Sequence, residues 1–337
     1  MEANRLTYCQ YLLSSQINYT LTNFADHAEE MSHDSINRYL RNTRVTGSDI
    51  WKQVQKEIVS SEQGYIVFDD TVLDKDYSHK IELVRPQYSG NAHGIIKGIG
   101  VVNCMYVNPE TDQYWIIDFR IYAPQVDGKS KLDHAQDMLK NTVEYKSLLV
   151  AAVLMDSWYA TRKMMLLIES LHLYYYCPLH SNRLVDDSSG TQPYRHVNSL
   201  QWSKKEIISG KTVKIKSFPK NHKVKLFRVA VSKNRTDFVV TNDSSQKTTS
   251  DIHQVYAWRW KIEQFHREAK QLTGLEKCEC RKARIQRNHI ACAFIVWTRL
   301  TQWAKKTAQT IYRTKRKLLD DYLYQQLKNP SINMQLA

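Results

Sequence analysis

The sequence lacks several features that would assign it to common protein classes. It has no Cys-x-x-Cys pair among its six cysteines, so we do not expect a structural zinc site. Only Cys278-Glu279-Cys280 places two cysteines close together, and that spacing is weak for metal ligands; scattered cysteines suit a reducing cytosol. The first ten residues carry no charged-then-apolar signal pattern, and no stretch approaches the ~20 apolar residues of a membrane helix. We therefore expect a cytoplasmic protein with no membrane partner.

Charge is unevenly distributed along the 337 residues. Lysine and arginine outnumber aspartate and glutamate by 48 to 34, which gives a net charge of +14. Residues 204–235 carry +10 and residues 277–317 carry +11, so the remainder of the chain is acidic at −7. Local basic surfaces of this kind indicate a polyanionic partner, most simply nucleic acid. The alternative interpretation is a pair of solvated basic faces.

Residues 1–60 predict a small helical DNA-binding domain. Segments 8–14, 21–30 and 35–41 have the spacing of short amphipathic helices, and Ser32-His33-Asp34 can cap the third. In that third helix Arg38 would point outward, and arginine is a good reader of base edges. A helix-turn-helix fits this pattern, although any small helical bundle would show it as well.

The middle of the chain predicts an α/β core. A short apolar strand at 65–68 ends at Asp69-Asp70-Thr71, and strands at 94–107 and 114–123 follow. A helix at 132–146 precedes the apolar run 149–155, which ends at Asp156 and predicts a strand buried on both faces. A helix at 161–171 and a strand at 173–177 complete the order β-β-β-α-β-α-β. Asp69 and Asp156 would then lie at the ends of two core strands, where ligands gather.

The expected domains follow from this order. They are a helical DNA-binding domain at 1–60, a first part of the core at 61–178, a basic β-rich insertion at 179–250, C-terminal core helices at 251–310, and a short helical tail at 311–337.

One segment combines several groups that suit phosphate chemistry. In a continuous helix at 252–272, Tyr256, Arg259, Glu263 and Lys270 fall within roughly 60° of arc. The apolar residues of the segment cluster on the other side, so that face would be buried. A carboxylate flanked by two cations and a phenol suits a divalent metal beside a phosphodiester.

The pattern Tyr-x2-Arg-x3-Glu-x6-Lys, after two strand-end aspartates, resembles the DDE transposases of bacterial insertion sequences, and within them the insertion-sequence-four superfamily. The runs Val67-Phe68-Asp69-Asp70-Thr71 and Leu154-Met155-Asp156-Ser157-Trp158 are similar to the first and second acidic motifs of that family. The resemblance extends over roughly residues 10–310.

This resemblance implies a ribonuclease-H-like mixed sheet with flanking helices, interrupted by the β-rich insertion. It implies Asp69, Asp156 and Glu263 as catalytic, metal-binding residues that hold two Mg²⁺ ions, with Mn²⁺ as the alternative and no small-molecule cofactor. Tyr256, Arg259 and Lys270 would hold phosphates of double-stranded DNA at a hairpin end. Trp202 is the candidate, by region alone, for stacking on a flipped base. A homodimer would cut the element out and join it to target DNA.

Each acid has another interpretation. Asp70 competes with Asp69 for the metal, and only one of two successive strand residues can face the site; the family pattern favours Asp69. Asp156 could cap a helix, and Glu263 could be a surface acid paired with Arg259. For the whole chain, the alternatives to a transposase are a non-catalytic DNA-binding regulator and a ribonuclease-H-like nuclease that only hydrolyses.

Overall fold

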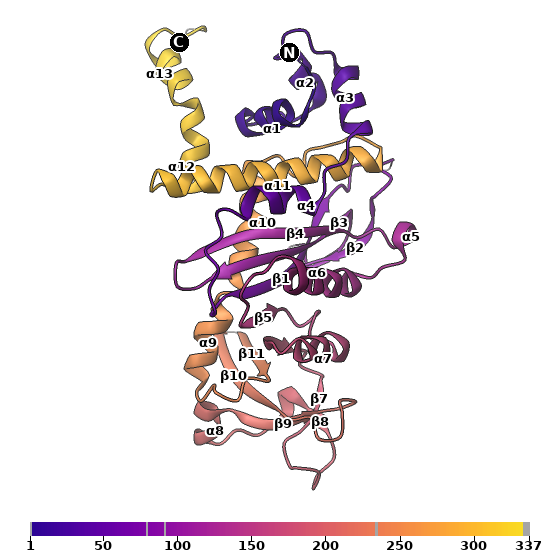
Figure 1. The fold of residues 1–337 in the computed structure, drawn as a ribbon, viewed down its shortest axis with the longest axis vertical. Helices are drawn as coiled ribbons and strands as arrows, with labels where there is room; N and C mark the ends of the chain where they lie inside the picture. Colours follow the sequence, from indigo (N-terminus) through magenta and orange to yellow (C-terminus); the bar gives the residue numbers. More distant parts are fainter. Residues whose placement is uncertain (1, 79, 91, 233–234, 333–337) are drawn as a thin grey trace, which may run out of the picture. The chain divides into compact units, whose positions relative to one another are not determined.

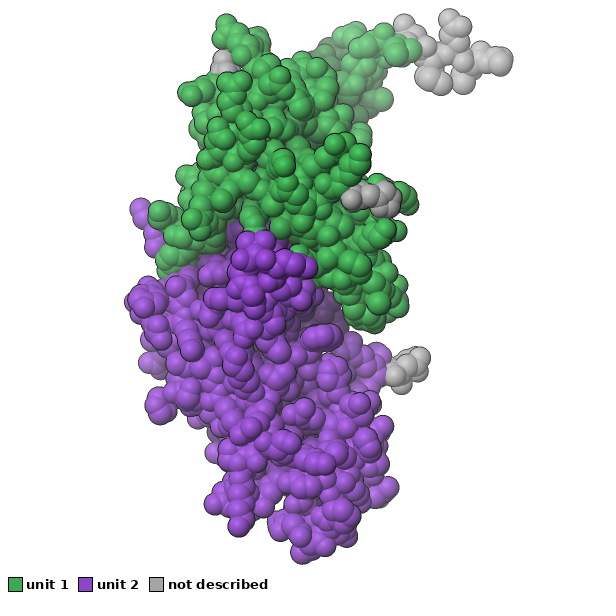
Figure 2. Space-filling view, turned by 90° about the vertical axis from the view of Figure 1, so that its right-hand side faces the viewer, with its two compact units in different colours: residues 1–54, 72–99, 265–337 green, residues 55–71, 100–264 purple. Residues whose placement is uncertain are grey.

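The computed structural model describes residues 2–78, 80–90, 92–232 and 235–332. The chain divides into two compact units, which Figure 2 distinguishes by colour. Unit 1 contains residues 1–54, 72–99 and 265–337, and unit 2 contains residues 55–71 and 100–264. Neither unit is a single stretch of sequence. The five domains expected from the sequence stay predictions.

The strands of the described residues form one mixed sheet of eleven strands (Figure 1). Its order is β2-β3-β1-β5-β6-β11-β10-β9-β7-β8, and β4 pairs with β3. The bounds are β1 Tyr65–Asp74, β2 Arg85–Ser89, β3 Gly94–Asn108, β4 Gln113–Ile121, β5 Ala152–Met155, β6 Tyr174–Leu179, β7 Leu184–Asp186, β8 Arg195–His196, β9 Lys211–Ile215, β10 Val224–Ser232 and β11 Arg235–Thr241.

Helices flank this sheet and form most of unit 1. Their bounds are α1 Arg5–Ser14, α2 Leu21–Asp26, α3 His33–Asn42, α4 Gly47–Val54, α5 Pro124–Asp127, α6 Lys131–Tyr145, α7 Arg162–Ser170, α8 Lys204–Ser209, α9 Thr249–Ala257, α10 Trp260–Leu272, α11 Ala283–Lys306, α12 Ile311–Arg316 and α13 Asp320–Lys328, with short 3₁₀ turns at Val197–Ser199 and Lys317–Leu319. No helix of the described residues is long and apolar enough to cross a membrane.

The centre of unit 2 is a parallel group of three strands. β1 pairs with β5 and β5 pairs with β6, all parallel, while β3 and β4 form an antiparallel hairpin. Parallel neighbours need a crossover connection, and α7 supplies the one between β5 and β6. All four residues of β5 are buried, as the uninterrupted apolar run predicts. The prediction of a mixed α/β core with flanking helices is confirmed.

The expected β-rich insertion is present and is joined to the core sheet. Its last strand β11 pairs antiparallel with the core strand β6, and β10 and β9 extend the sheet beyond it. The insertion therefore lengthens the sheet of unit 2. Its chain returns directly from β11 to α9, which begins the segment that the sequence singled out.

In unit 1 the N-terminal helices pack on the long helix α11 instead of forming a separate body (Figure 1). Asn288 of α11 is fully buried and binds the end of α3 and the segment that follows it through three hydrogen bonds. Its side chain accepts the N–H of Val45 at 2.8 Å and donates to the carbonyls of Leu40 at 2.7 Å and Thr43 at 2.8 Å. The Tyr8 hydroxyl of α1 likewise lies 2.8 Å from Nδ1 of His289. Buried polar contacts therefore fix these helices to α11.

Replacing Asn288 by leucine should release the N-terminal helices. The substitution keeps the branching of the side chain but leaves one buried N–H and two carbonyls without their partner, so the free energy of unfolding should fall by about 1–3 kcal/mol. Urea denaturation measures the loss, and hydrogen exchange should show faster exchange of the Val45 amide. Gln302→Leu, on the same helix, is the control. Equal stability of the two variants would contradict the role given to Asn288.

Candidate active site

Asp69 and Asp156 lie next to each other because of the register of two parallel strands. Phe68 of β1 pairs with Met155 of β5, so the residue that follows each is an aspartate at the same level of the sheet. The sequence-based expectation that Asp69 ends its strand is wrong, since β1 continues to Asp74. Only β5 ends there, at Met155. The two carboxylates still meet, because the pairing of β1 with β5 sets their level.

The environment of both aspartates disfavours their charged forms. Burial, then the charges of Asp156 and Asp70, raise the pKa of Asp69 well above its usual value. Burial, and then the charge of Asp70, also raise the pKa of Asp156, although backbone N–H groups oppose the shift. Carboxylates held together against their mutual repulsion are a common sign of a functional site.

Asp156 does not cap a helix. One of its carboxylate oxygens accepts the N–H groups of Trp158 at 2.9 Å and Tyr159 at 3.2 Å, which closes a tight turn after β5. The next helix, α7, is capped by the Thr161 side chain. The second oxygen of Asp156 has no hydrogen-bond partner among the described residues. It is therefore available to a ligand.

Asp70 has both carboxylate oxygens bound within the protein. Lys131, the first residue of α6, donates to one oxygen at 2.5 Å, and the Tyr159 hydroxyl donates to the other at 2.9 Å. Successive strand residues point to opposite faces, so Asp69 and Asp70 cannot share one role. The occupied oxygens of Asp70 favour Asp69 as the ligand, as the sequence pattern does.

The signature helix expected at 252–272 is two helices. α9 ends at Ala257 and α10 begins at Trp260. At the break, the N–H groups of Trp258 and Arg259 bind carbonyls three residues back, as in a 3₁₀ turn, which rotates further per residue than an α-helix. The continuous arc of four side chains predicted from the sequence is therefore wrong. No glycine or proline marks the break.

Burial also differs from the expected polar face. Tyr256 is 2% exposed and Arg259 is 3% exposed, whereas the Glu263 side chain is 43% exposed. Nη1 of Arg259 lies 3.1 Å from Oε1 of Glu263. Burial alone would lower the pKa of Arg259. Its pKa is nevertheless raised, because nearby groups outweigh the effect of burial; these groups are Tyr256, Asp69, Glu263 and Asp156. Arg259 is thus the positive charge that the three acids share.

The three predicted metal ligands do not form one cage. Among the described ranges of the chain, no group of three histidine, cysteine, aspartate or glutamate residues is placed to hold a metal ion. Asp69 and Asp156 suit a hard divalent cation, which prefers oxygen ligands. Their pKa values are raised, and one oxygen of Asp156 has no hydrogen-bond partner among the described residues. Glu263 is bound to Arg259, and its carboxylate would have to leave that ion pair to become a third ligand.

The remaining predicted residues have protein partners or exposed positions. The Tyr256 hydroxyl donates to Asp237 at 3.1 Å. Lys270 belongs to unit 1, where its ammonium donates to the Val72 carbonyl at 2.9 Å and pairs with Glu276 at 2.7 Å. Trp202 stacks on Phe238, with ring centroids 6.4 Å apart. Their roles toward DNA stay predictions.

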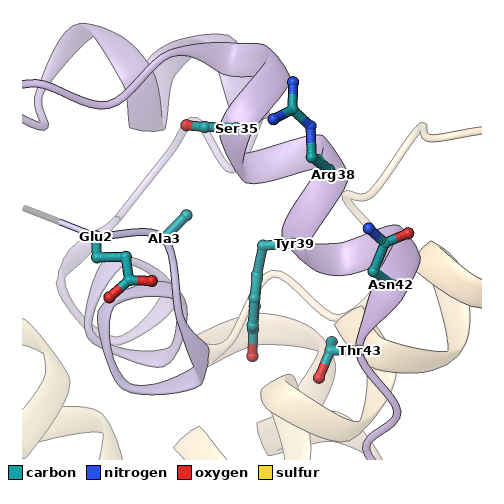
Figure 3. A pocket seen from close by; sticks show the side chains of 7 residues that line it. All are labelled: Glu2, Ala3, Ser35, Arg38, Tyr39, Asn42 and Thr43. Atoms are coloured by element: carbon teal, nitrogen blue, oxygen red, sulfur yellow. The ribbon is translucent and has the colours of Figure 1, made fainter.

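Arg38 lies on the exposed side of α3, where Ile36 and Leu40 are fully buried on the other. It lines a surface hollow of unit 1 with Ser35, Tyr39 and Asn42 of the same helix (Figure 3). Glu2, Ala3 and Thr43 complete the lining. The capped, amphipathic helix predicted here is confirmed, with the Ser32 side chain accepting the N–H of Ser35.

Sequence reasoning missed several residues of the site. They are Lys131, Tyr159, Arg235, Asp237 and Trp260. The alternation Arg235-x-Asp237 within a β-prone run was the one available signal, since it places both side chains on one face of a strand.

Replacing Asp69 by asparagine should stabilise the metal-free protein at neutral pH. The folded pKa of Asp69 lies above its unfolded value, so its stabilising contribution is present below the unfolded pKa of about 3.9 and is lost as pH rises through the folded pKa. Urea unfolding with a chelator should show Asp69→Asn above wild type at pH 7, with the difference shrinking toward pH 4. The exposed Asp34→Asn is the control. A less stable Asp69→Asn at pH 7 would contradict the cause given for the shift.

The family model described as Transposase DDE domain matches residues 116–299, which include Asp156, Glu263 and the residues around the helix break. No curated protein matches the chain.

Solved structures of low identity resemble the chain. A piggyBac transposase synaptic complex with hairpin DNA has a TM-score of 0.48 at 10% identity, covering 98% of this chain and 73% of that one. Endonuclease V from Bacillus subtilis has 0.28 at 9% identity, covering 71% and 95%. Ciona intestinalis endonuclease V, in complex with a 24mer DNA containing an inosine followed by a ribo-adenosine, has a TM-score of 0.27 at 13% identity, covering 76% of this chain and 95% of that one.

The family model spans more than half of the length of this chain. The chain therefore belongs to the transposase DDE domain family.

Proposed function

We propose that this protein is the transposase of a bacterial insertion sequence, of the insertion-sequence-four superfamily. It would bind the terminal inverted repeats as a cytoplasmic homodimer, cut the DNA strands through hairpin ends and join them to target DNA. The observation that carries the proposal is the position of Asp69 and Asp156, each one residue beyond the paired Phe68 and Met155 of adjacent strands, beside a buried arginine that also binds Glu263.

The acids would hold divalent cations, two Mg²⁺ or alternatively Mn²⁺. Bound at Asp69, Asp156 and Glu263, such ions would activate a water or a DNA 3′-hydroxyl and stabilise the leaving oxygen. The aspartates are preorganised for this by the strand pairing. Because a cation binds the charged carboxylates and their pKa values are raised, cation binding should weaken as the pH falls.

Arg259 would bind a phosphate oxygen of the DNA. Its Nε is buried and has no hydrogen-bond partner among the described residues, although a buried donor of this kind is costly to leave unpaired. The guanidinium stays charged at any pH at which the protein folds. A phosphate at Arg259 would compete with Glu263, whose side chain is 43% exposed and can swing away. Substrate binding and release of the third carboxylate would then be coupled.

Cleavage should depend on the acids separately from DNA binding. With Mg²⁺ and DNA carrying the inverted repeats, wild type should give nicks, hairpins and joined products. Asp156→Asn and Glu263→Gln should lower cleavage by at least about a hundredfold, because each removes a carboxylate that is proposed to hold the metal, and both should still retard the DNA.

The exposed Glu57→Gln should cleave like wild type and controls for loss of a surface charge. Normal cutting by both site variants would overturn the site. Binding by wild type without any cutting would instead indicate a regulator, and hydrolysis without joining would indicate a nuclease.

Arg38 should contribute to recognition of the repeats. Arg38→Ala is expected to weaken binding to the inverted repeat by about 1–3 kcal/mol and binding to unrelated DNA much less, because a base-edge contact distinguishes sequences. Gel retardation with both DNAs measures the difference. Lys52→Ala, exposed on α4, is the matched control. An equal loss on both DNAs would assign Arg38 to the phosphate backbone.

A further inference from the structure

Asp237 is the largely buried centre of a hydrogen-bond cluster that the transposase signature does not contain. It lies on β11, and its side chain is 10% exposed. Arg235 donates to both of its oxygens, through Nε at 2.9 Å and Nη2 at 3.0 Å, and the Tyr256 hydroxyl donates at 3.1 Å. A two-pronged arginine–carboxylate contact fixes direction as well as distance. Asp237 therefore ties the last strand of the insertion to the end of α9.

The cluster continues to Arg259 through aromatic rings. The Arg235 guanidinium lies 5.8 Å from the centroid of the Trp260 ring, and Arg259 lies 4.6 Å from the same centroid. Arg259 is also 5.5 Å from the centroid of Tyr256. Asp237 thus holds one aromatic neighbour of Arg259 directly and the other through Arg235.

Arg259 needs such support because of its place in the chain. It lies at the break between α9 and α10, where the helical hydrogen-bond ladder is interrupted. Its one ion pair among the described residues is to Glu263, whose side chain is 43% exposed, and its Nε has no hydrogen-bond partner among those residues. The two rings lie against its guanidinium and therefore help to set its direction.

We propose that Asp237 is a positioning residue, which holds Tyr256 and Arg235 so that Arg259 points at the phosphate of the bound DNA. This rests on the proposed function, since it assumes that Arg259 binds phosphate during strand cleavage. Asp237 itself touches neither DNA nor metal. The simpler alternative is that Asp237 only fastens the β10–β11 hairpin to α9, which would affect stability alone.

Asp237→Asn is the informative variant because it keeps the shape and removes the charge. At saturating inverted-repeat DNA and Mg²⁺, and at a temperature well below the melting temperature of the variant, kcat for cleavage should fall by about 10- to 100-fold, the cost expected for a misdirected catalytic group, while KM for DNA stays close to wild type. Asp237→Glu should recover part of the loss. Adding Tyr256→Phe to Asp237→Asn should lower kcat little further, because the Tyr256 hydroxyl acts through its hydrogen bond to Asp237.

Asp186→Asn is the control. It removes another buried acid of the insertion, whose partner is Ser188 in its own loop. A wild-type kcat in Asp237→Asn would overturn the proposal. A loss of kcat that appears only near the melting temperature of the variant and disappears on cooling would also overturn it. Cleavage by neither protein would refute the proposed function instead.

Proton exchange at Arg259 tests the positioning role of Asp237 without catalysis, and so also if neither protein cleaves DNA. The ¹⁵N–¹H signal of the Arg259 Nε, assigned by its absence in Arg259→Lys, should exchange slowly in wild type and at least about tenfold faster in Asp237→Asn, because the guanidinium is no longer held. An unchanged exchange rate would overturn the proposal.

Discussion

The site depends on placing two mutually repelling carboxylates at adjacent positions of a buried sheet. The pairing of Phe68 with Met155 fixes this, and the backbone hydrogen bonds of β1 and β5 hold the acids where their charges cost free energy. Arg259 compensates part of that cost from the helix break. Surrounding residues support this arrangement. Lys131 and Tyr159 donate hydrogen bonds to Asp70, and Asp237 accepts one from Tyr256, a neighbour of Arg259.

Much of the fold was predictable because its signals are local. The apolar run before Asp156 predicts a doubly buried strand, and the structure has one. The cap of α3 at Ser32 and the β-rich character of the insertion are equally local. What the sequence misjudged depends on distant partners. Aspartates disfavour strands, so Asp69-Asp70 indicated a strand end, yet the pairing of β1 within the sheet carries the strand to Asp74.

The site was predictable in its residue types more than in its geometry. The spacing from Tyr256 to Lys270 suits a continuous helix, because no glycine or proline interrupts it. The 3₁₀ turn at Trp258 and Arg259 coincides with burial of Tyr256 and Arg259 against strand β11 and the acids, contacts that no local pattern encodes. The contact of Asp237 with Tyr256 could not be predicted for the same reason, although the alternation of Arg235 and Asp237 on one strand face was visible.

The parallel pairing of β1 with β5 also has a consequence for how the chain folds. Between these strands lie β2, β3, β4 and α6, so the acids can meet only after a long loop has closed. Contacts of such large sequence separation form slowly. Electrostatic repulsion between the aspartates opposes the same step. We therefore expect the pairing of β1 with β5 to form late in folding, so that their apolar residues stay exposed to water until then.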